Sequence, residues 1–373
     1  MSRMGLYEQI DAAVEQALGR GSAAARAGEA VPAKDALHGD VTLTAAMVQA
    51  ERLEVAPRAL AARLVEALGA LEGVSGASVA GGGFVNVKLT QAFVAASLTP
   101  EALAPERGTG PVAVLQGLRA GPREAMSAAA AVRLADALGQ TVVQELSAPV
   151  DVTALLQGLV GPEARFGAAS EAEFDGLAAE LGQITGALET AARVSFFAPR
   201  GAGLRPGLYE AATEGRALCT GLAEAMIPEG LSESEAQLAR LYVLCHRADR
   251  ALDMTARPFL QPDQSNPAFL LHYAASRLAG LKAAGPLDWS DETRRLALHL
   301  AYFPKLLALA DRLAAPHRLG LFLLEASQLL LAAQAAGQKR GEKAICAEVI
   351  DACEVVFSRG FAILGTTPLA EIT

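Results

Sequence analysis

The last third of the chain carries the clearest pattern of hydrophobic and polar positions. Apolar side chains recur there every three or four residues, which places them on one face of an α-helix. The three resulting stripes are Leu296, Leu300, Phe303, Leu307, Ala310 and Leu313; Leu319, Phe322, Leu323, Ala326, Leu330 and Ala333; and Ile345, Val349, Ala352 and Val356. Pro316 fits the first turn of the second helix, where a missing N–H costs nothing. The pattern predicts an all-α C-terminal bundle of four or five helices.

The first hundred residues alternate between helical and strand patterns. The predicted elements are helices over 6–17, 38–50 and 57–68 and strands over 74–80 and 84–89. Gly81, Gly82 and Gly83 join the two strands, and glycine tolerates the positive φ of a tight turn. Because a strand follows the turn, we interpret it as a hairpin and not as a phosphate cradle, which needs a helix directly after it. The segment predicts a small α+β N-terminal domain.

The middle of the chain begins with a β-α-β pattern. Its parts are a strand over 111–116, the end of a helix over 133–139 and a strand over 141–144. Such a unit is typical of a Rossmann-like parallel sheet. The further predicted elements are helices over 151–160, 171–192 and 232–250, a strand over 193–197 and a loop over 199–207. The predicted fold class is therefore mixed α/β, multidomain and predominantly helical.

Composition narrows the class of protein. The chain has 373 residues, of which 52% are hydrophobic and 20% charged, as in a globular protein of two or three domains. The longest apolar run is interrupted by Glu325 and Gln328, short of the ~18–20 residues of a membrane span. We also identify no export signal. The four cysteines lack metal-ligand spacing, so we expect buried thiols, a cytoplasmic location, no membrane association and no metal.

The net charge of −9 is unevenly distributed. Residues 1–110 carry −3, residues 111–263 carry −7 and residues 264–373 carry +1. An acidic protein is not a typical nucleic-acid binder, so any RNA contact would depend on local basic clusters.

Two sets of motifs resemble one known family. The C-terminal set is Asn266-Pro267, His272-Tyr273-Ala274 with Arg277, Phe303-Pro304, Pro316-His317-Arg318-Leu319 and Leu364-Gly365 with Pro368. The N-terminal set is His38-Gly39-Asp40, Ala46-Met47, Pro57-Arg58 and Gly83-Phe84-Val85-Asn86. The first resembles the DALR anticodon-binding domain of arginyl-tRNA synthetases, and the second their additional N-terminal domain, which leans on the tRNA elbow. The resemblance implies domains over 1–108, 109–262 and 263–373.

In that family the middle region is a Rossmann-type core that activates arginine with ATP. It uses a His-x-Gly-His turn (HIGH) and a lysine-bearing loop (KMSKS). Here no histidine occurs between His38 and His246, and no lysine between Lys88 and Lys282. The degenerate ATP-site region contains Arg119, Arg123 and Ser127. An arginine neutralises phosphate charge but does not reproduce the placement of histidine nitrogens. We therefore expect a shortened core with no ATP site, no cofactor and no catalytic residue.

The sequence contains no motif for a different catalytic site in place of the missing ATP site. Cys245 and His246 are adjacent and point in different directions on a helix, so they are a poor nucleophile–base pair. The acidic run Glu171, Glu173 and Asp175 is typical of a solvated helix start. Neither a GxSxG motif nor a P-loop is present.

Two functions from different classes follow. The first is a pseudoenzyme of translation that binds tRNA or regulates its use, with RNA-binding candidates Arg277, Arg318, Lys339, Arg340 and Lys343. The basic loop predicted over 337–341 is equally consistent with a solvated connection. The second is a scaffold whose helical end binds a protein, either a synthetase or a second copy of itself. Partial exposure of the leucines at 329–331 would favour it. A third, less favoured, is an arginine–tRNA ligase with altered motifs.

Overall fold

The computed structural model describes residues 5–19, 30–35, 38–105, 107–108, 110–116, 121–143, 171–200, 210, 213–281, 289–339 and 345–368. The chain forms two compact units. Unit 1 consists of Met1–Ala104, Arg277–Lys305 and Glu325–Phe357, and unit 2 of Pro105–Ser276, Leu306–Leu324 and Ser358–Thr373. The domain boundaries expected at residues 108 and 262 stay predictions.

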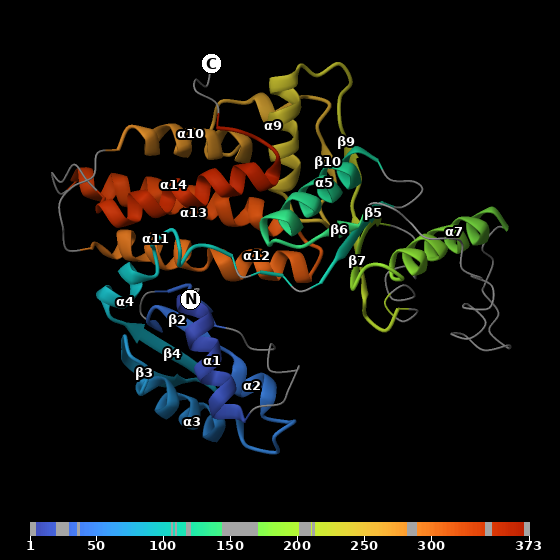
Figure 1. The fold of residues 1–373 in the computed structure, drawn as a ribbon. Coiled ribbons are helices and arrows are strands. Elements are labelled where there is room, and N and C mark those ends of the chain that lie inside the picture. Colours follow the sequence, from blue (N-terminus) through green and yellow to red (C-terminus); the bar gives the residue numbers. More distant parts are fainter. Residues whose placement is uncertain are drawn as a thin grey trace. The chain divides into compact units, whose positions relative to one another are not determined.

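The N-terminal part of unit 1 is a small sheet with helices. Its four strands are antiparallel and lie in the order β1 (Val31–Pro32), β2 (Val41–Leu43), β4 (Phe84–Leu89), β3 (Val74–Ala80). The accompanying helices are α1 (Leu6–Leu18), α2 (Ala45–Gln49), α3 (Pro57–Gly69) and α4 (Gln91–Ala96), shown in blue and teal in Figure 1. The sheet and its helices confirm the predicted α+β domain.

The core of this sheet follows from two periodicities. Leu60, Leu64 and Leu68 lie on one face of α3, and Val85 and Val87 alternate along β4; all five are fully buried. Burying a side chain of this size contributes about 1.5–3 kcal/mol, so this face holds α3 on the sheet.

One prediction for this domain was wrong. A helix was expected directly after Asp40, but Val41–Leu43 is a strand that pairs with β4. Val41 and Leu43 are buried while Thr42 is half-buried, which is the two-residue period of a strand. A three-residue strand is too short for its period to be distinguished from a helix start in the sequence. The helix begins four residues later, at Ala45.

Unit 2 contains a four-stranded parallel sheet in the order β6 (Val142–Val143), β5 (Val112–Gln116), β7 (Arg193–Pro199), β8 (Ala217–Leu222). Helix α5 (Pro122–Ala137) connects β5 to β6, and α7 (Glu171–Ala187) precedes β7. Phe196 packs with residues of α7 and Phe197 with residues of α5, so both faces of the sheet are covered, as parallel sheets require. The predicted Rossmann-like β-α-β unit is confirmed (Figure 1).

The remaining elements of this region differ from the prediction in length. Helix α7 ends at Ala187 and not at residue 192, and α9 (Glu233–Leu244) ends six residues before Arg250. Short parallel strands β9 (Ala225–Met226) and β10 (Leu252–Asp253) and the 3₁₀ helix η3 (Pro258–Leu260) complete it. The helix predicted over 151–160 and most of the loop predicted over 199–207 lie outside the described residues.

The last third of the chain is helical, as predicted. Its helices are α10 (Pro267–Ala279), α11 (Asp291–Ala301), α12 (Phe303–Arg312), α13 (His317–Lys339) and α14 (Ala347–Leu364). The residues of the three predicted stripes are buried, with the exception of Leu313. Leu313 is 41% exposed because it lies beyond Arg312, where α12 ends. The predicted loop at 337–341 was also placed too early, since Gly337, Gln338 and Lys339 belong to α13.

Helix α13 is long and apolar. Among the described residues, it alone reaches the length and composition of a membrane span, over His317–Gly337 with a mean hydropathy of 1.5. However, its Leu319, Leu323 and Leu330 are fully buried in the protein. A core helix of this kind passes the same test, so the stretch is weak evidence for a membrane.

Candidate functional site

The carboxyl edge of a parallel α/β sheet is where such folds bind ligands, next to the strands at which the chain direction reverses. In unit 2 this edge lies where β5, β7 and β8 end and α5 begins. Arg123 stands in the first turn of α5, at this position. The predicted degenerate ATP-site region therefore belongs to the edge that a nucleotide would occupy in a Rossmann fold.

The guanidinium of Arg123 joins α5 to the segment after β8 and to the turn after α9. The side chain is only 2% exposed. Its Nη1 donates to the carbonyl oxygens of Ala223 (2.7 Å) and Arg250 (2.6 Å), and its Nη2 donates to the carbonyl oxygen of Arg247 (2.7 Å). Burial lowers the pKa of the guanidinium, which nevertheless stays protonated in proteins. With these donors engaged, Arg123 does not present them to a phosphate.

The structure describes one of the other two members of that predicted region. Ser127 lies one turn further along α5 and is 4% exposed. Arg119 lies outside the described residues.

Two histidines border the same edge. The Nδ1 of His246 lies 2.6 Å from the carbonyl oxygen of Tyr242, and burial lowers the pKa of this imidazole. Burial and the neighbouring charge of Arg318 lower the pKa of His317 to about 4. Cys245 instead directs its thiol to the carbonyl oxygen of Gly320, and burial raises the pKa of that thiol. Cys245 and His246 thus contact different groups, in agreement with the packing role predicted for them.

Gly320, in the first turns of α13, allows this helix to approach the end of α9 closely. A Cβ atom there would lie 2.2 Å from the carbonyl oxygen of Leu244. The start of α13 is therefore fixed against the end of α9, next to the turn that Arg123 holds.

The predicted RNA-binding residues fall in separate places. Arg277 is exposed near the end of α10, and Arg318 is exposed in the first turn of α13. Lys339 is the last residue of α13. Arg340 and Lys343 lie outside the described residues.

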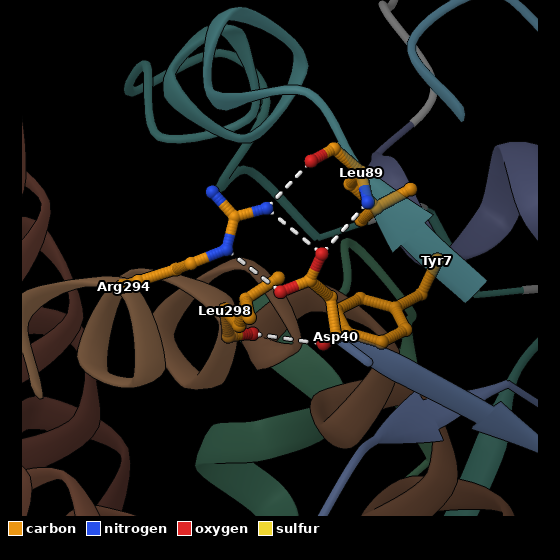
Figure 2. A network of polar contacts seen from close by, with 5 residues as sticks. All are labelled: Tyr7, Asp40, Leu89, Arg294 and Leu298. Carbon is orange, nitrogen blue, oxygen red and sulfur yellow. Dashed lines mark hydrogen bonds and ion pairs between the residues drawn. The ribbon is translucent and has the colours of Figure 1, made fainter. Parts of the chain in front are cut away.

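Unit 1 is held together by the aspartate of the His38-Gly39-Asp40 motif. Figure 2 shows the Asp40 carboxylate accepting from the backbone N–H of Leu89 (2.7 Å) and from Nε and Nη2 of Arg294 (2.7 and 2.8 Å). The same Nη2 donates to the carbonyl oxygen of Leu89 (2.6 Å), and the fully buried Tyr7 donates to the carbonyl oxygen of Leu298 (3.0 Å). Asp40 thus joins the N-terminal sheet to α11, which gives the motif a structural role.

A second polar anchor joins the same parts of unit 1. Lys305 is 7% exposed and donates to the carboxylate of Asp11 and to the carbonyl oxygen of Ala30 (2.9 Å). The buried ammonium has its charge compensated by the carboxylate, as a buried lysine requires.

Four large apolar side chains are exposed in the N-terminal part of unit 1. Val31 on β1 is 38% exposed, and Met47 and Val48 on α2 and Phe84 at the start of β4 are 43%, 47% and 38% exposed. Gly83 lies beside α2, because a Cβ atom there would lie 3.2 Å from Cγ of Met47, and its φ of +141° also favours glycine. We call Met47, Val48 and Phe84 the α2–β4 patch.

Two cations accompany the α2–β4 patch. Arg58 follows Pro57, whose Cβ would lie 3.1 Å from a Cβ on Gly83. Arg52 follows α2 and donates to the side chain of Gln49 (2.8 Å). Both arginines are exposed. The sequence analysis quoted Met47, Arg58 and Phe84 as motif residues but did not identify this surface, which depends on pairing between separate segments.

Comparisons with known proteins agree with this architecture. Residues 6–89 match the family described as arginyl tRNA synthetase N terminal domain. An arginine–tRNA ligase of Rhizobium meliloti is 52% identical over 62 residues, which are 17% of this chain and 11% of the ligase. The sequence match thus spans about a tenth of the ligase.

Solved structures extend the similarity to the fold of the whole chain. The arginyl-tRNA synthetase of Thermus thermophilus superposes with a TM-score of 0.71 at 14% identity, covering 98% of this chain and 100% of that one. The arginyl-tRNA synthetase of Plasmodium falciparum gives 0.66 at 9% identity, with 100% of each chain covered. The protein is therefore arginyl-tRNA synthetase-like: residues 6–89 match the N-terminal domain of that family, and the fold of the chain is similar to that of arginyl-tRNA synthetases.

Proposed function

We propose that this protein binds tRNA and does not aminoacylate it. The observation that carries the proposal is the position of Arg123. At the edge of the sheet where a Rossmann core binds its nucleotide, a buried guanidinium is bound by three carbonyl groups of the protein itself. The chain also lacks any histidine between His38 and His246 and any lysine between Lys88 and Lys282.

The α2–β4 patch supports the RNA-binding half of the proposal. Proteins recognise unpaired bases by stacking them on aromatic or guanidinium planes, and each stacked base contributes about 1–3 kcal/mol. Phe84 offers an exposed ring, and Arg52 and Arg58 bring positive charge to its surroundings. The match of residues 6–89 to a synthetase N-terminal domain favours tRNA as the RNA.

A protein partner is the second candidate function. Leu329 and Leu331 on α13 are half-buried, while Leu330 between them is fully buried. Two partly exposed leucines on one helix favour association with another protein, either a synthetase or a second copy of this chain.

The experiment is a fluorescence titration of labelled total tRNA with the full chain over a series of salt concentrations. Binding that weakens steeply with salt is expected, because phosphate contacts release counterions. Phe84→Ala should weaken binding about tenfold, which corresponds to one lost stacking contact. Leu260→Ala is the control, since Leu260 is equally exposed (39%) but lies in unit 2.

Absence of binding even at low salt would overturn the RNA-binding proposal. If the Phe84→Ala variant binds tRNA as tightly as the original chain, the α2–β4 patch is not part of the RNA-binding surface. Thermal melting of both variants checks that the exposed side chains were not needed for folding.

A further inference from the structure

Four exposed arginines from separate segments of unit 2 surround the carboxyl edge of the parallel sheet. Arg200 directly follows β7, Arg247 and Arg250 lie in the turn after α9, and Arg318 lies in the first turn of α13. More than a hundred residues separate the first from the last, so the cluster exists only in the folded protein. We call it the arginine cluster.

Hydrogen bonds place three of these residues next to one another. Buried Arg123 binds the carbonyl oxygens of both Arg247 and Arg250. Nη1 of Arg200 donates to the carbonyl oxygen of Asp249 (3.3 Å), in the same turn. The turn after α9 is therefore held by buried Arg123 and is also contacted by Arg200, which follows β7.

Electrostatic coupling places Arg318 beside the same turn. The imidazole of His317, its neighbour in the chain, interacts with the charges of Arg123, Arg247 and Asp249 as well as with that of Arg318. The close packing of Gly320 against Leu244 fixes this end of α13 there. The four guanidinium groups thus belong to one surface.

The guanidinium groups of this surface are accessible to a ligand. The side chain of Arg247 is 74% exposed and pairs with Asp249 through two bonds of 3.1 Å. An exposed pair of this kind contributes about 0–1 kcal/mol and yields readily to a stronger anion. The side chains of Arg250 and Arg318 make no hydrogen bond or ion pair with another described residue.

The cluster stands out against an acidic background. Residues 111–263 carry a net charge of −7. Around the cluster, five arginines, including Arg123, accompany the carboxylates of Glu124 and Asp249, whose charges interact with that of Arg123. Positive charge gathered on one surface of an otherwise acidic region marks a site for an anion.

We propose that the arginine cluster binds the phosphodiester backbone of RNA. The guanidinium fork matches phosphate oxygens in a bidentate geometry. Arg123 fills the interior of the edge, so four guanidiniums spread over the surface fit successive phosphates of a chain better than one enclosed nucleotide. The inference rests on the proposed tRNA binding and adds a second contact surface, distinct in its residues from the α2–β4 patch.

The test compares Arg318→Gln and the triple variant Arg247→Gln, Arg250→Gln, Arg318→Gln with the full original chain, using labelled tRNA over a salt series. A plot of log K against log salt has a negative slope, and each lost phosphate contact makes this slope less steep by about 0.7–0.9. The triple variant should therefore lose about two units of slope or more, and its affinity at low salt should fall at least about tenfold. Arg216→Gln is the matched control, because exposed Arg216 directly precedes β8 at the opposite edge of the same sheet.

The outcomes separate this inference from the proposed function. If the original chain binds tRNA and the triple variant keeps its slope, the arginine cluster is not an RNA surface, whereas the proposed function stands. If the original chain binds no tRNA, both fall. Equal loss in Arg216→Gln, or tighter binding of polyglutamate than of tRNA by the original chain, would also overturn the inference.

Discussion

Two buried polar networks, one in each unit, use an arginine in opposite ways. In unit 1 the guanidinium of Arg294 meets the carboxylate of Asp40, so the charges compensate each other. In unit 2 the guanidinium of Arg123 donates, among the described residues, to the carbonyl oxygens of Ala223, Arg247 and Arg250, while the carboxylates of Glu124 and Asp249 act on its charge without a hydrogen bond to it. The first network joins the N-terminal sheet to α11. The second occupies the edge of a sheet where a ligand would bind.

The two regions also differ in how they resemble a synthetase. Residues 6–89 match the N-terminal domain by sequence, whereas the chain as a whole is similar to the synthetase structures above in fold, at 14% and 9% identity. A cation at the carboxyl edge of a parallel sheet, bound there by carbonyl groups of the protein itself, stabilises the fold at the place where such sheets bind ligands. We therefore expect the Arg123 network to be the more sensitive of the two to substitution.

The largest effect is expected from Arg123→Met. The substitution leaves three carbonyl groups without their donor, and each buried acceptor left unpaired costs about 1–3 kcal/mol. Urea denaturation of the full chain measures it. Arg123→Lys should recover only part of the loss, since an ammonium does not reproduce the planar fork. An Arg123→Met chain as stable as the original would show that the network is not structural.

Asp40→Ala should rank second, at about 3 kcal/mol, because it leaves Arg294 without its counter-ion and the N–H of Leu89 without its acceptor. The same urea denaturation compares it with Arg294→Met and with the double variant. The double variant should lose clearly less than the sum of the two single losses, since the residues act as a pair. Additive losses would contradict a direct coupling.

We also expect acid to destabilise unit 2, because protonation of its buried histidines favours the unfolded chain. Burial lowers the pKa of His272, and burial with nearby cations lowers that of His317, each to about 4 from an ordinary value of 6.5. The unfolded chain binds these protons below about pH 6.5 and the folded chain only near pH 4. The contribution of these histidines to the free energy of unfolding is therefore fully present above pH 6.5 and is lost as the pH falls, by about 3 kcal/mol for His272 when the pH reaches 4.

Denaturation at several pH values between 7 and 4.5 measures this slope. His272→Leu should reduce the slope in that range while leaving the contribution of His317. An unchanged slope in the variant would mean that His272 is already protonated in the folded chain.

The smallest effect is expected from Tyr7→Phe. It removes the hydrogen bond from Tyr7 to the carbonyl oxygen of Leu298 and keeps the buried ring, so about 1 kcal/mol should be lost. A thermal melt of the full chain detects it. If Tyr7→Phe loses as much stability as Asp40→Ala, the hydrogen bond of Tyr7 contributes as much to the unit 1 network as the ion pair of Asp40, contrary to this ranking.

The sequence was informative wherever a period or a motif stayed within one element. The leucine stripes, the hairpin at Gly81–Gly83 and the β-α-β unit all depend on local spacing, and the structure contains them. Val41–Leu43 was missed because three residues do not establish a period.

The sites were harder to predict, because their partners lie far apart in the chain. The sequence analysis quoted Arg123 in the degenerate ATP-site region, which stays a prediction, but its three carbonyl acceptors follow it by 100 to 127 residues. Sequence spacing gives no signal for such contacts. The arginine cluster escaped prediction for the same reason, since its members come from separate segments of the chain.

The most direct test of the central claim is the incubation of the purified full chain with ATP, labelled arginine and total tRNA, under conditions in which tRNA binding has been demonstrated. We predict that the chain binds the tRNA and forms no arginyl-tRNA above a control without protein, because Arg123 occupies the edge of the sheet and the histidine and lysine motifs are missing. Formation of arginyl-tRNA that continues with time and requires ATP would contradict the account.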